Sequence, residues 1–210
     1  MARTRSPAYD DQREMILARA AELFSQRGYP ATSMNQLAEA CGLSKPTLYH
    51  YYRDKYALLV QIAEGHVARL AELVRSIEAQ GLPAEQRLHQ LVVRFVEEYA
   101  DAQHAHRVLT EDVRFLEPDD RARVLVIERQ VVDGFARALV ELRPEFEAAH
   151  LARPVSMLLF GMINWMFTWL RPGGRLGHDE MAPIVADLFF GGLHHVRIPP
   201  SCLEPDPSPP

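Results

Sequence analysis

Apolar side chains recur every three or four residues along most of this chain, between about residues 11 and 195. That spacing puts them on one face of a helix, whereas a half-buried strand would alternate apolar and polar residues. We find no convincing alternation of that kind. Glycine, proline and helix-capping residues interrupt the pattern at intervals, so the sequence predicts an all-α fold of successive helices.

Three helices are predicted in the first 55 residues. The first covers residues 11–26 and stops before Gly28, because glycine readily takes the left-handed conformation that ends a helix. Ser33 and Gln36 have the spacing of a capping box, which starts the second helix. A tight glycine turn then leads to a third helix over residues 45–52. Two short helices joined in this way form a helix-turn-helix.

The third predicted helix carries side chains that suit the major groove of DNA. Leu48 and Tyr52 are four residues apart and are expected to face the core, with Leu37, Leu43 and Phe24. The outer faces keep donors and flat apolar edges, which a helix in the major groove needs. These outward residues are Lys45, Thr47, Tyr49, His50 and Tyr51.

Position along this helix indicates what each residue contacts. Lys45 and Pro46 lie at its start and are expected to reach base edges, because recognition helices lead with their N-terminal residues. Tyr49, like the ring of Pro46, can pack on a thymine methyl group. The candidates for phosphate binding are Thr32, Ser33, Thr47, His50 and Lys55. For Lys55, the spacing equally allows a solvated charge at the start of the next helix.

One gapless motif joins these features: Gly28-Tyr29-Pro30-Ala31-Thr32-Ser33-Met34, then Leu37-Ala38, then Cys41-Gly42-Leu43-Ser44-Lys45-Pro46-Thr47-Leu48-Tyr49-His50-Tyr51-Tyr52 and Lys55. Over residues 12–60 the chain resembles the N-terminal domain of TetR/AcrR-family regulators. The resemblance implies an all-helical homodimer in which positions matching Lys45, Pro46, Thr47, Tyr49, His50, Tyr51 and Lys55 contact operator DNA. Tyr52, where phenylalanine is commoner, and Asn35, where some members carry a base-reading arginine, depart from the family pattern.

The same resemblance implies a division of the chain into a DNA-binding head and a larger body. We expect a flexible arm over residues 1–10, a helix-turn-helix domain over 11–55 and a helical effector-binding and dimerisation domain over 56–197. A proline-rich tail over 198–210 should be disordered. Residues 1–55 hold eight basic and six acidic residues, although the whole chain has a net charge of −5. A mildly basic head on an acidic body suits a protein that touches a polyanion with one end.

The last two predicted helices, over residues 154–170 and 179–195, are the most apolar. The first of them is uncharged, but it is too short and too interrupted by polar residues to indicate a membrane partner. The family usually dimerises through these helices, which the resemblance therefore makes the dimer seam here; packing within the chain is the alternative. The interface candidates are Gly161, Phe189, Phe190, Gly191, Gly192 and Leu193.

Aromatic residues of the body are ordinarily core, but a helical bundle is also where a small-molecule cavity forms. The effector-binding candidates are Phe95, Tyr99, Phe115, Phe135, Asn164 and Trp165. Asn164 is notable as an amide on an apolar helix, because a buried amide needs a partner. Residues 161–165, Trp169, residues 171–176 and 186–189 resemble a family branch that regulates fatty-acid, steroid and aromatic-acid breakdown. That resemblance implies an acyl-CoA thioester as effector.

The sequence thus predicts a cytoplasmic repressor that a small molecule releases from a palindromic operator. A constitutive DNA-binding regulator without an effector is one alternative. A helical enzyme is another, but His104 with His106, and His194 with His195, have no third metal ligand at suitable spacing. No catalytic signature is found, so no catalytic residue, metal or cofactor is predicted. The N-terminus lacks the features of a signal peptide.

Overall fold

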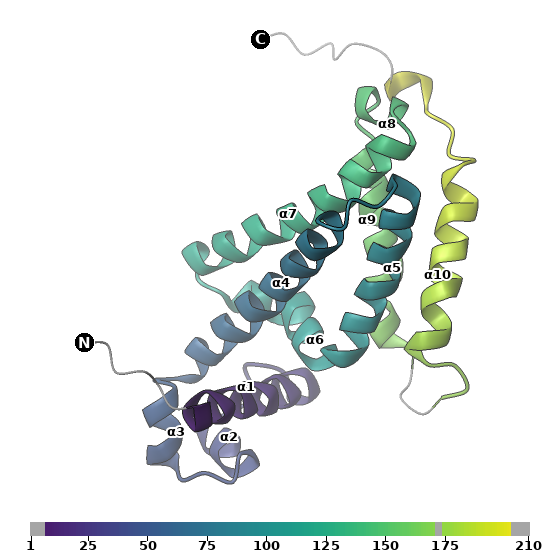
Figure 1. The fold of residues 1–210 in the computed structure, drawn as a ribbon. Helices are drawn as coiled ribbons and strands as arrows, with labels where there is room; N and C mark the ends of the chain where they lie inside the picture. Colours follow the sequence, from purple (N-terminus) through teal and green to yellow (C-terminus); the bar gives the residue numbers. More distant parts are fainter. Residues whose placement is uncertain (1–6, 171–173, 203–210) are drawn as a thin grey trace. The chain divides into compact units, whose positions relative to one another are not determined.

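The computed structural model describes residues 7–170 and 174–202, and the elements that it assigns there are all helical (Figure 1). The all-α prediction is therefore confirmed. The helices are α1 (Pro7–Arg27), α2 (Met34–Ala40), α3 (Lys45–Tyr51), α4 (Lys55–Glu78), α5 (Ala84–Asp101), α6 (Gln103–Asp112), α7 (Pro118–Leu142), α8 (Glu145–Ala148), α9 (Ala152–Asn164) and α10 (His178–Leu193), with 3₁₀ turns η1 (Val113–Phe115), η2 (Met166–Thr168) and η3 (Pro200–Cys202).

The chain forms two compact units, each assembled from two segments. The first unit comprises residues 1–69 and 102–127, and the second comprises residues 70–101 and 128–210. The three boundaries between them fall within α4, between α5 and α6, and within α7. The first unit therefore contains the whole helix-turn-helix, together with the first part of α4, α6 and the start of α7.

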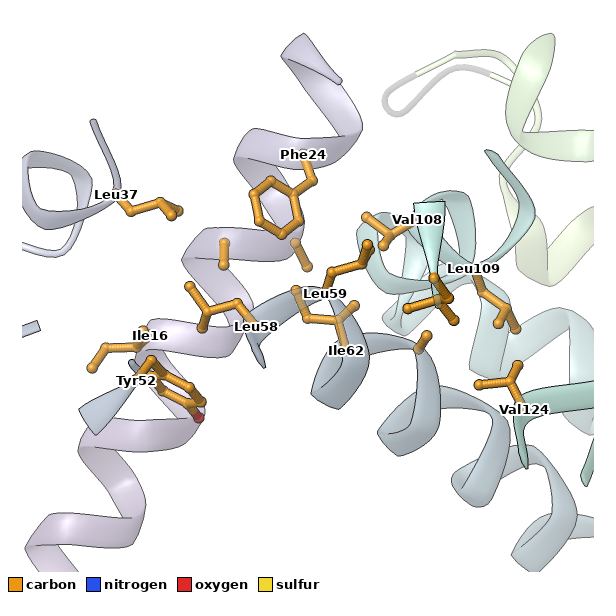
Figure 2. Close-up of a cluster of buried hydrophobic side chains, with 14 of the residues drawn as sticks. Ile16, Phe24, Leu37, Tyr52, Leu58, Leu59, Ile62, Val108, Leu109 and Val124 are labelled. Carbon is orange, nitrogen blue, oxygen red and sulfur yellow. The ribbon is translucent and has the colours of Figure 1, made fainter. Parts of the chain in front are cut away.

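The core of the first unit is built from the apolar faces that the sequence indicated. Phe24 of α1, Leu37 of α2 and Leu48 of α3 are all buried, as are Leu58 and Leu59 of α4. Figure 2 shows side chains of α1, α4 and α6 gathered in this cluster. The helix-turn-helix thus shares one hydrophobic core with the longer helices α1, α4 and α6.

The second unit is organised around α5, which packs along α10. Five residues of α5 that recur at helical spacing are buried: Leu88, Leu91, Val92, Phe95 and Tyr99. Arg143 closes the C-terminal end of α10 by donating to the carbonyl oxygens of Leu193 at 2.6 Å and Val196 at 3.2 Å. A cation at that end of a helix is favoured by the helix dipole.

A close helix contact in the second unit depends on Gly134 of α7. A Cβ atom built at this glycine would lie 2.3 Å from Cγ1 of Val74 in α4. Two carbon atoms cannot approach to that distance, so the two helices lie closer than any larger residue would allow. The sequence pattern gave no sign of this contact, because Gly134 sits inside an uninterrupted helical periodicity.

Some predicted helix boundaries were wrong. The helix expected over residues 154–170 ends at Asn164, and a 3₁₀ turn follows. Thr168 donates its hydroxyl to the carbonyl oxygen of Trp165 at 2.7 Å, and its amide bonds the same oxygen at 3.1 Å. Hydrogen bonds to the carbonyl group three residues earlier are those of a 3₁₀ helix, which is wound more tightly than an α-helix. Residues 171–173 lie outside the described structure.

The two ends of the chain also differ in part from expectation. α1 begins at Pro7, inside the segment expected to be a flexible arm, and proline is favoured at a first helical position. The 3₁₀ turn η3 lies inside the segment expected to be a disordered tail. Residues 1–6 and 203–210 fall outside the described structure. Of the helices described, none combines the length and apolarity that crossing a membrane requires.

Candidate nucleic-acid interface

The start of α2 has the capping box that its sequence predicts. The hydroxyl of Ser33 accepts the amide of Gln36 at 3.3 Å, and the side-chain oxygen of Gln36 accepts the amide of Ser33 at 2.8 Å. This reciprocal pair starts the helix at a defined residue, because two amides that α2 would leave unbonded have partners. Ser33 itself is exposed.

The turn between α2 and α3 is equally well determined by local chemistry. Gly42 has a φ of +64°, the left-handed conformation that favours glycine. Ser44 then caps α3 by accepting the amide of Thr47 at 3.2 Å, and Pro46 occupies the first turn. Both predicted helix starts are therefore confirmed, and the helix-turn-helix has satisfied ends.

α3 divides its side chains between the core and the surface as predicted. Leu48 and Tyr52 are buried, whereas the opposite side is open to solvent. Tyr49 is 43 % exposed, and the ammonium group of Lys45 lies 6.0 Å from the centre of its ring. The exposed positions are Lys45, Pro46, Thr47, Tyr49 and His50, and Tyr51 is half-buried.

Two residues of α1 brace the C-terminal half of α3. The ring of Tyr9 stacks on Tyr51 with centroids 4.9 Å apart, and its edge contacts His50 at 6.2 Å. Arg13 donates to the hydroxyl of Tyr52 at 3.3 Å. Sequence reasoning missed Tyr9, because it placed the start of the first helix after this residue.

The hydroxyl group that distinguishes Tyr52 from the commoner phenylalanine accepts a hydrogen bond from Arg13. It lies against Arg13, whose guanidinium also donates to Gln61 of α4 at 2.7 Å. Burial is the main cause that raises the pKa of Tyr52, so its hydroxyl stays protonated. The group therefore links α1, the end of α3 and α4 through a polar contact inside the first unit.

Two of the predicted phosphate-binding residues are engaged within the chain. Thr32 is buried and donates its hydroxyl to the carbonyl oxygen of Gly28 at 3.0 Å. The ammonium group of Lys55 donates to three backbone carbonyl groups, those of Tyr29, Pro30 and Thr32. Lys45, Thr47 and His50 of α3 are exposed instead, and the hydroxyl of Thr47 lies 2.7 Å from that of Ser44.

Three of the predicted effector-binding residues meet in the core of the second unit. Phe95 contacts Phe135 edge-on with ring centroids 4.9 Å apart, and it contacts Tyr99 at 5.9 Å. Phe160, which the sequence did not single out for this role, joins them at 4.8 Å from Phe135. Burial, and next the charge of Glu128, raise the pKa of Tyr99, so this ring is neutral.

The other three predicted effector-binding residues lie elsewhere. Phe115 belongs to the first unit, where its ring lies 5.6 Å from that of Tyr29. Trp165 is 64 % exposed at the end of α9. Asn164 is half-buried, and its side-chain oxygen is buried without a hydrogen-bond partner among the described residues. Phe115 thus belongs to a different unit from the other five candidates.

The predicted dimer residues separate into two groups. Phe189 and Leu193 are buried within their own unit, on the side of α10 that faces the core, and Phe190 is half-buried with its ring stacked 5.9 Å from His89. Gly161, Gly191 and Gly192 are exposed, and a Cβ atom added at any of them would meet nothing within 4 Å. Large apolar side chains are also exposed on these two helices: Met157, Leu158, Met162, Ile184 and Leu188.

The histidines that invited a metal interpretation have other contacts. His104 lies 2.8 Å from the hydroxyl of Ser25. His106 is buried, with its Nδ1 3.3 Å from Nε2 of the buried His66. Within the described part of the chain, no group of three His, Cys, Asp or Glu residues is placed to hold a metal ion.

Comparison with known protein families gives two matches that together cover most of the chain. Residues 16–62 match the family described as bacterial regulatory proteins, tetR family. Residues 81–193 match the family described as tetracyclin repressor-like, C-terminal domain. The first match contains the complete helix-turn-helix, and the second contains α5 to α10.

Individual relatives agree with these matches over nearly the whole chain. The transcriptional activator FasR of Mycolicibacterium smegmatis is 28 % identical over 190 residues, which are 90 % of this chain and 86 % of FasR. A TetR-family regulator from Bordetella parapertussis superposes with a TM-score of 0.81 and 34 % identity, over 88 % of this chain and 97 % of that one. AibR, solved with isovaleryl coenzyme A and operator DNA, gives a TM-score of 0.73 at 24 % identity, over 84 % and 97 % of the two chains.

Proposed function

This chain belongs to the TetR family of bacterial regulators, and we propose that it is a repressor released from a palindromic operator by a small-molecule effector. The family and the similar proteins are transcriptional regulators rather than enzymes. The observation that carries the proposal is the solvent-facing side of α3, where cationic, hydroxyl and aromatic groups stand on a capped helix with a buried opposite side. We place the protein in the cytoplasm, where bacterial operators are found.

The proposed operator contacts are those of the exposed side chains. Lys45, at the start of α3, would donate to a guanine edge, and Tyr49 one turn further would pack on a thymine methyl group. Ser33, Thr47 and His50 would bind phosphates and fix the register of the helix. Palindromic recognition follows if two copies present their α3 helices about 34 Å apart, one turn of DNA.

We assign the dimer interface to the exposed apolar face of α9 and α10. Leu158 is 70 % exposed and Leu188 is 66 % exposed, values that a lone chain would not favour for leucine. The exposed Gly161, Gly191 and Gly192 would let a partner helix approach closely. Phe189 and Leu193 are not part of this proposed seam, because the core of their own unit covers them.

The dimer proposal is tested by the mass of the protein in solution. Light scattering should give twice the chain mass for the wild type and the mass of one chain for Leu158→Asp, since a buried carboxylate at the seam is unfavourable. Val126→Asp is the matched control, because Val126 is also exposed but lies on α7. A dimer that survives Leu158→Asp and Leu188→Asp together would contradict the assignment.

We propose an acyl-CoA thioester as the effector and the second unit as its binding region. The support is the likeness of the fold to AibR, a protein solved with isovaleryl coenzyme A and operator DNA. The unpartnered oxygen of Asn164 suits a ligand that donates a hydrogen bond. Because α4 contributes residues to both units, we take it as the element through which the effector changes the separation of the two α3 helices.

A binding titration tests the effector proposal directly. Fluorescence anisotropy of labelled promoter DNA from upstream of the protein's own gene is followed with and without isovaleryl-CoA, long-chain acyl-CoAs and free coenzyme A. Release by a thioester but not by coenzyme A is the expected result, and an effector acts only through its different affinity for the two states. Tight DNA binding that no thioester alters would contradict the effector class and favour a constitutive regulator.

A further inference from the structure

We propose that Lys55 is a positioning residue that clamps the base of the helix-turn-helix, and that it acts on operator binding through this clamp rather than by contacting a phosphate. The inference rests on the DNA-binding function and names a role for one residue within it. The helix-turn-helix begins at Ser33 and ends at Tyr52. Lys55, the first residue of α4, reaches back from its end to the loop before its beginning.

The contacts of the ammonium group define the clamp. Nζ of Lys55 lies 2.9 Å from the carbonyl oxygen of Tyr29, 3.1 Å from that of Pro30 and 2.9 Å from that of Thr32. An ammonium group has three N–H donors, so each carbonyl group can take one. A phosphate could bind this cation only by displacing one of the three carbonyl oxygens.

The Tyr29 peptide is held from the opposite side as well. The carboxylate of Asp112, at the end of α6, accepts the backbone amide of Tyr29 and is only 5 % exposed. The Tyr29 ring packs edge-on against Phe24 at 5.3 Å and lies beneath the Lys55 ammonium at 4.5 Å. A cation over an aromatic face is attracted to it. Tyr29 is therefore hydrogen-bonded both by Lys55 of α4, at its carbonyl group, and by Asp112 of α6, at its amide.

This arrangement determines where the helix-turn-helix sits on the longer helices. Thr32, bonded by Lys55, is directly followed by Ser33, whose side chain caps α2. α2 in turn packs on α3. Without the clamp, the loop has fewer bonds to α4, and the position of α2 and α3 is less well fixed. Preorganised groups bind more tightly than groups that must be ordered on binding.

The salt dependence of operator binding separates the two roles of Lys55. A residue that binds a phosphate releases counterions, so its loss lowers the slope of log K against log salt by about 0.9 per head. We expect Lys55→Met to weaken operator binding by about tenfold or more, the size of a lost charge-assisted hydrogen bond, with the slope unchanged. Lys45→Met is the comparison: Lys45 is exposed on α3 and is proposed to enter the groove, where its charge displaces counterions even as it donates to a base, so its removal should make the slope shallower.

A conservative variant and local hydrogen exchange complete the test. Lys55→Arg keeps the charge, but a planar guanidinium cannot reproduce three bonds from one nitrogen, so it should not restore affinity. In both variants the amides of residues 29–36 should exchange faster, while those of α5 and α10 keep their protection. If Lys55→Met does not fold, Lys55→Arg alone decides between the roles by its affinity and slope.

Two outcomes would overturn the inference. Lys55→Arg could bind the operator like the wild type while Lys55→Met loses slope, which is the behaviour of a phosphate ligand. Alternatively, Lys55→Met could leave both affinity and exchange unchanged, which would make the clamp inconsequential. Wild-type protein that fails to bind any operator would instead refute the proposed function, so the two failures are distinguishable.

Discussion

Aromatic side chains gather at two places in this molecule, and they are used in opposite ways. On α3, Tyr49 and His50 stand in solvent, and Tyr51 is half-covered by Tyr9. In the second unit, Phe95 and Phe135 are completely buried and contact one another and Phe160. The first set leaves its faces and hydroxyl groups available to a partner, whereas the rings of the second set are each other's partners.

This difference shows how far an aromatic cluster in a sequence indicates function. At α3 the buried Leu48 and Tyr52 fix the orientation of the helix, so the side that remains must face outwards. In the second unit, Phe95, Phe135 and Phe160 are hydrophobic neighbours of one another, and burial alone explains these three rings. If this comparison is correct, substitutions in the two sets affect different properties: stability in the second unit and DNA binding on α3.

The largest expected effect is that of Phe135→Ala. Removing a buried ring that touches two others should lower the free energy of unfolding by about 3–5 kcal/mol, through lost burial and the cavity left behind. Tyr49→Ala, the matched removal of an exposed ring, should change it by less than about 0.5 kcal/mol. Urea unfolding followed by circular dichroism measures both, and equal losses would abolish the distinction between the two sets.

A smaller effect is expected where two helices of the second unit meet. Gly134→Ala should destabilise by about 1–3 kcal/mol, because the added Cβ would overlap Val74 and the helices would have to move apart. Gly65→Ala in α4 is the control, since its Cβ would meet only Arg69 at an ordinary 3.9 Å. A helix-interior glycine replaced without strain should gain about 0.5–1 kcal/mol. Thermal melts of the two variants should therefore shift in opposite directions.

Acid should destabilise the first unit through its buried histidine pair. Burial lowers the pKa of His66 to about 3 and that of His106 to about 4, from an ordinary 6.5. As the pH falls below about 6.5, these histidines become protonated in the unfolded state but stay neutral in the folded state. The free energy of unfolding therefore falls with pH until the folded-state pKa values are reached. The slope is at most about 1.4 kcal/mol per pH unit for each histidine.

The pair is tested by urea unfolding between pH 7 and pH 4.5. The double variant His66→Gln/His106→Gln should show a flatter decline of stability with acid than the wild type, whatever its stability at pH 7. Arg69, whose guanidinium lies 3.3 Å from Nδ1 of His66, adds to the cost of protonation and remains in the variant. If the free energy of unfolding fell with pH as steeply in the double variant as in the wild type, His66 and His106 would not be the cause of the acid sensitivity.

The sequence predicted the helix-turn-helix well because its structure is decided locally. Ser33 with Gln36, Gly42, and Ser44 with Pro46 each specify one helix end through contacts within a few residues. The all-helical fold and the buried face of α5 were likewise predictable from periodicity alone. These are properties of short segments, which a sequence displays directly.

Features that depend on distant segments could not be predicted in the same way. The sequence alone allows Lys55 to be a surface cation. Its hydrogen bonds to the loop of Tyr29, more than twenty residues earlier in the chain, appear only in the folded structure. Phe115 and Trp165 look like the other aromatic residues of the body, yet one lies in the first unit and the other is exposed. Periodicity gives the side of a helix that is buried but not the element that covers it.

The central claim, that the exposed side of α3 reads operator DNA, is tested most directly by one titration. Labelled promoter DNA is titrated with the wild-type protein and with Tyr49→Ala, at a salt concentration where the wild type binds tightly. We expect Tyr49→Ala to lose about tenfold or more in affinity for the operator, as for one lost base contact per head, with its melting temperature unchanged. Equal affinity of the two proteins for the operator would contradict the assignment of α3 as the recognition helix.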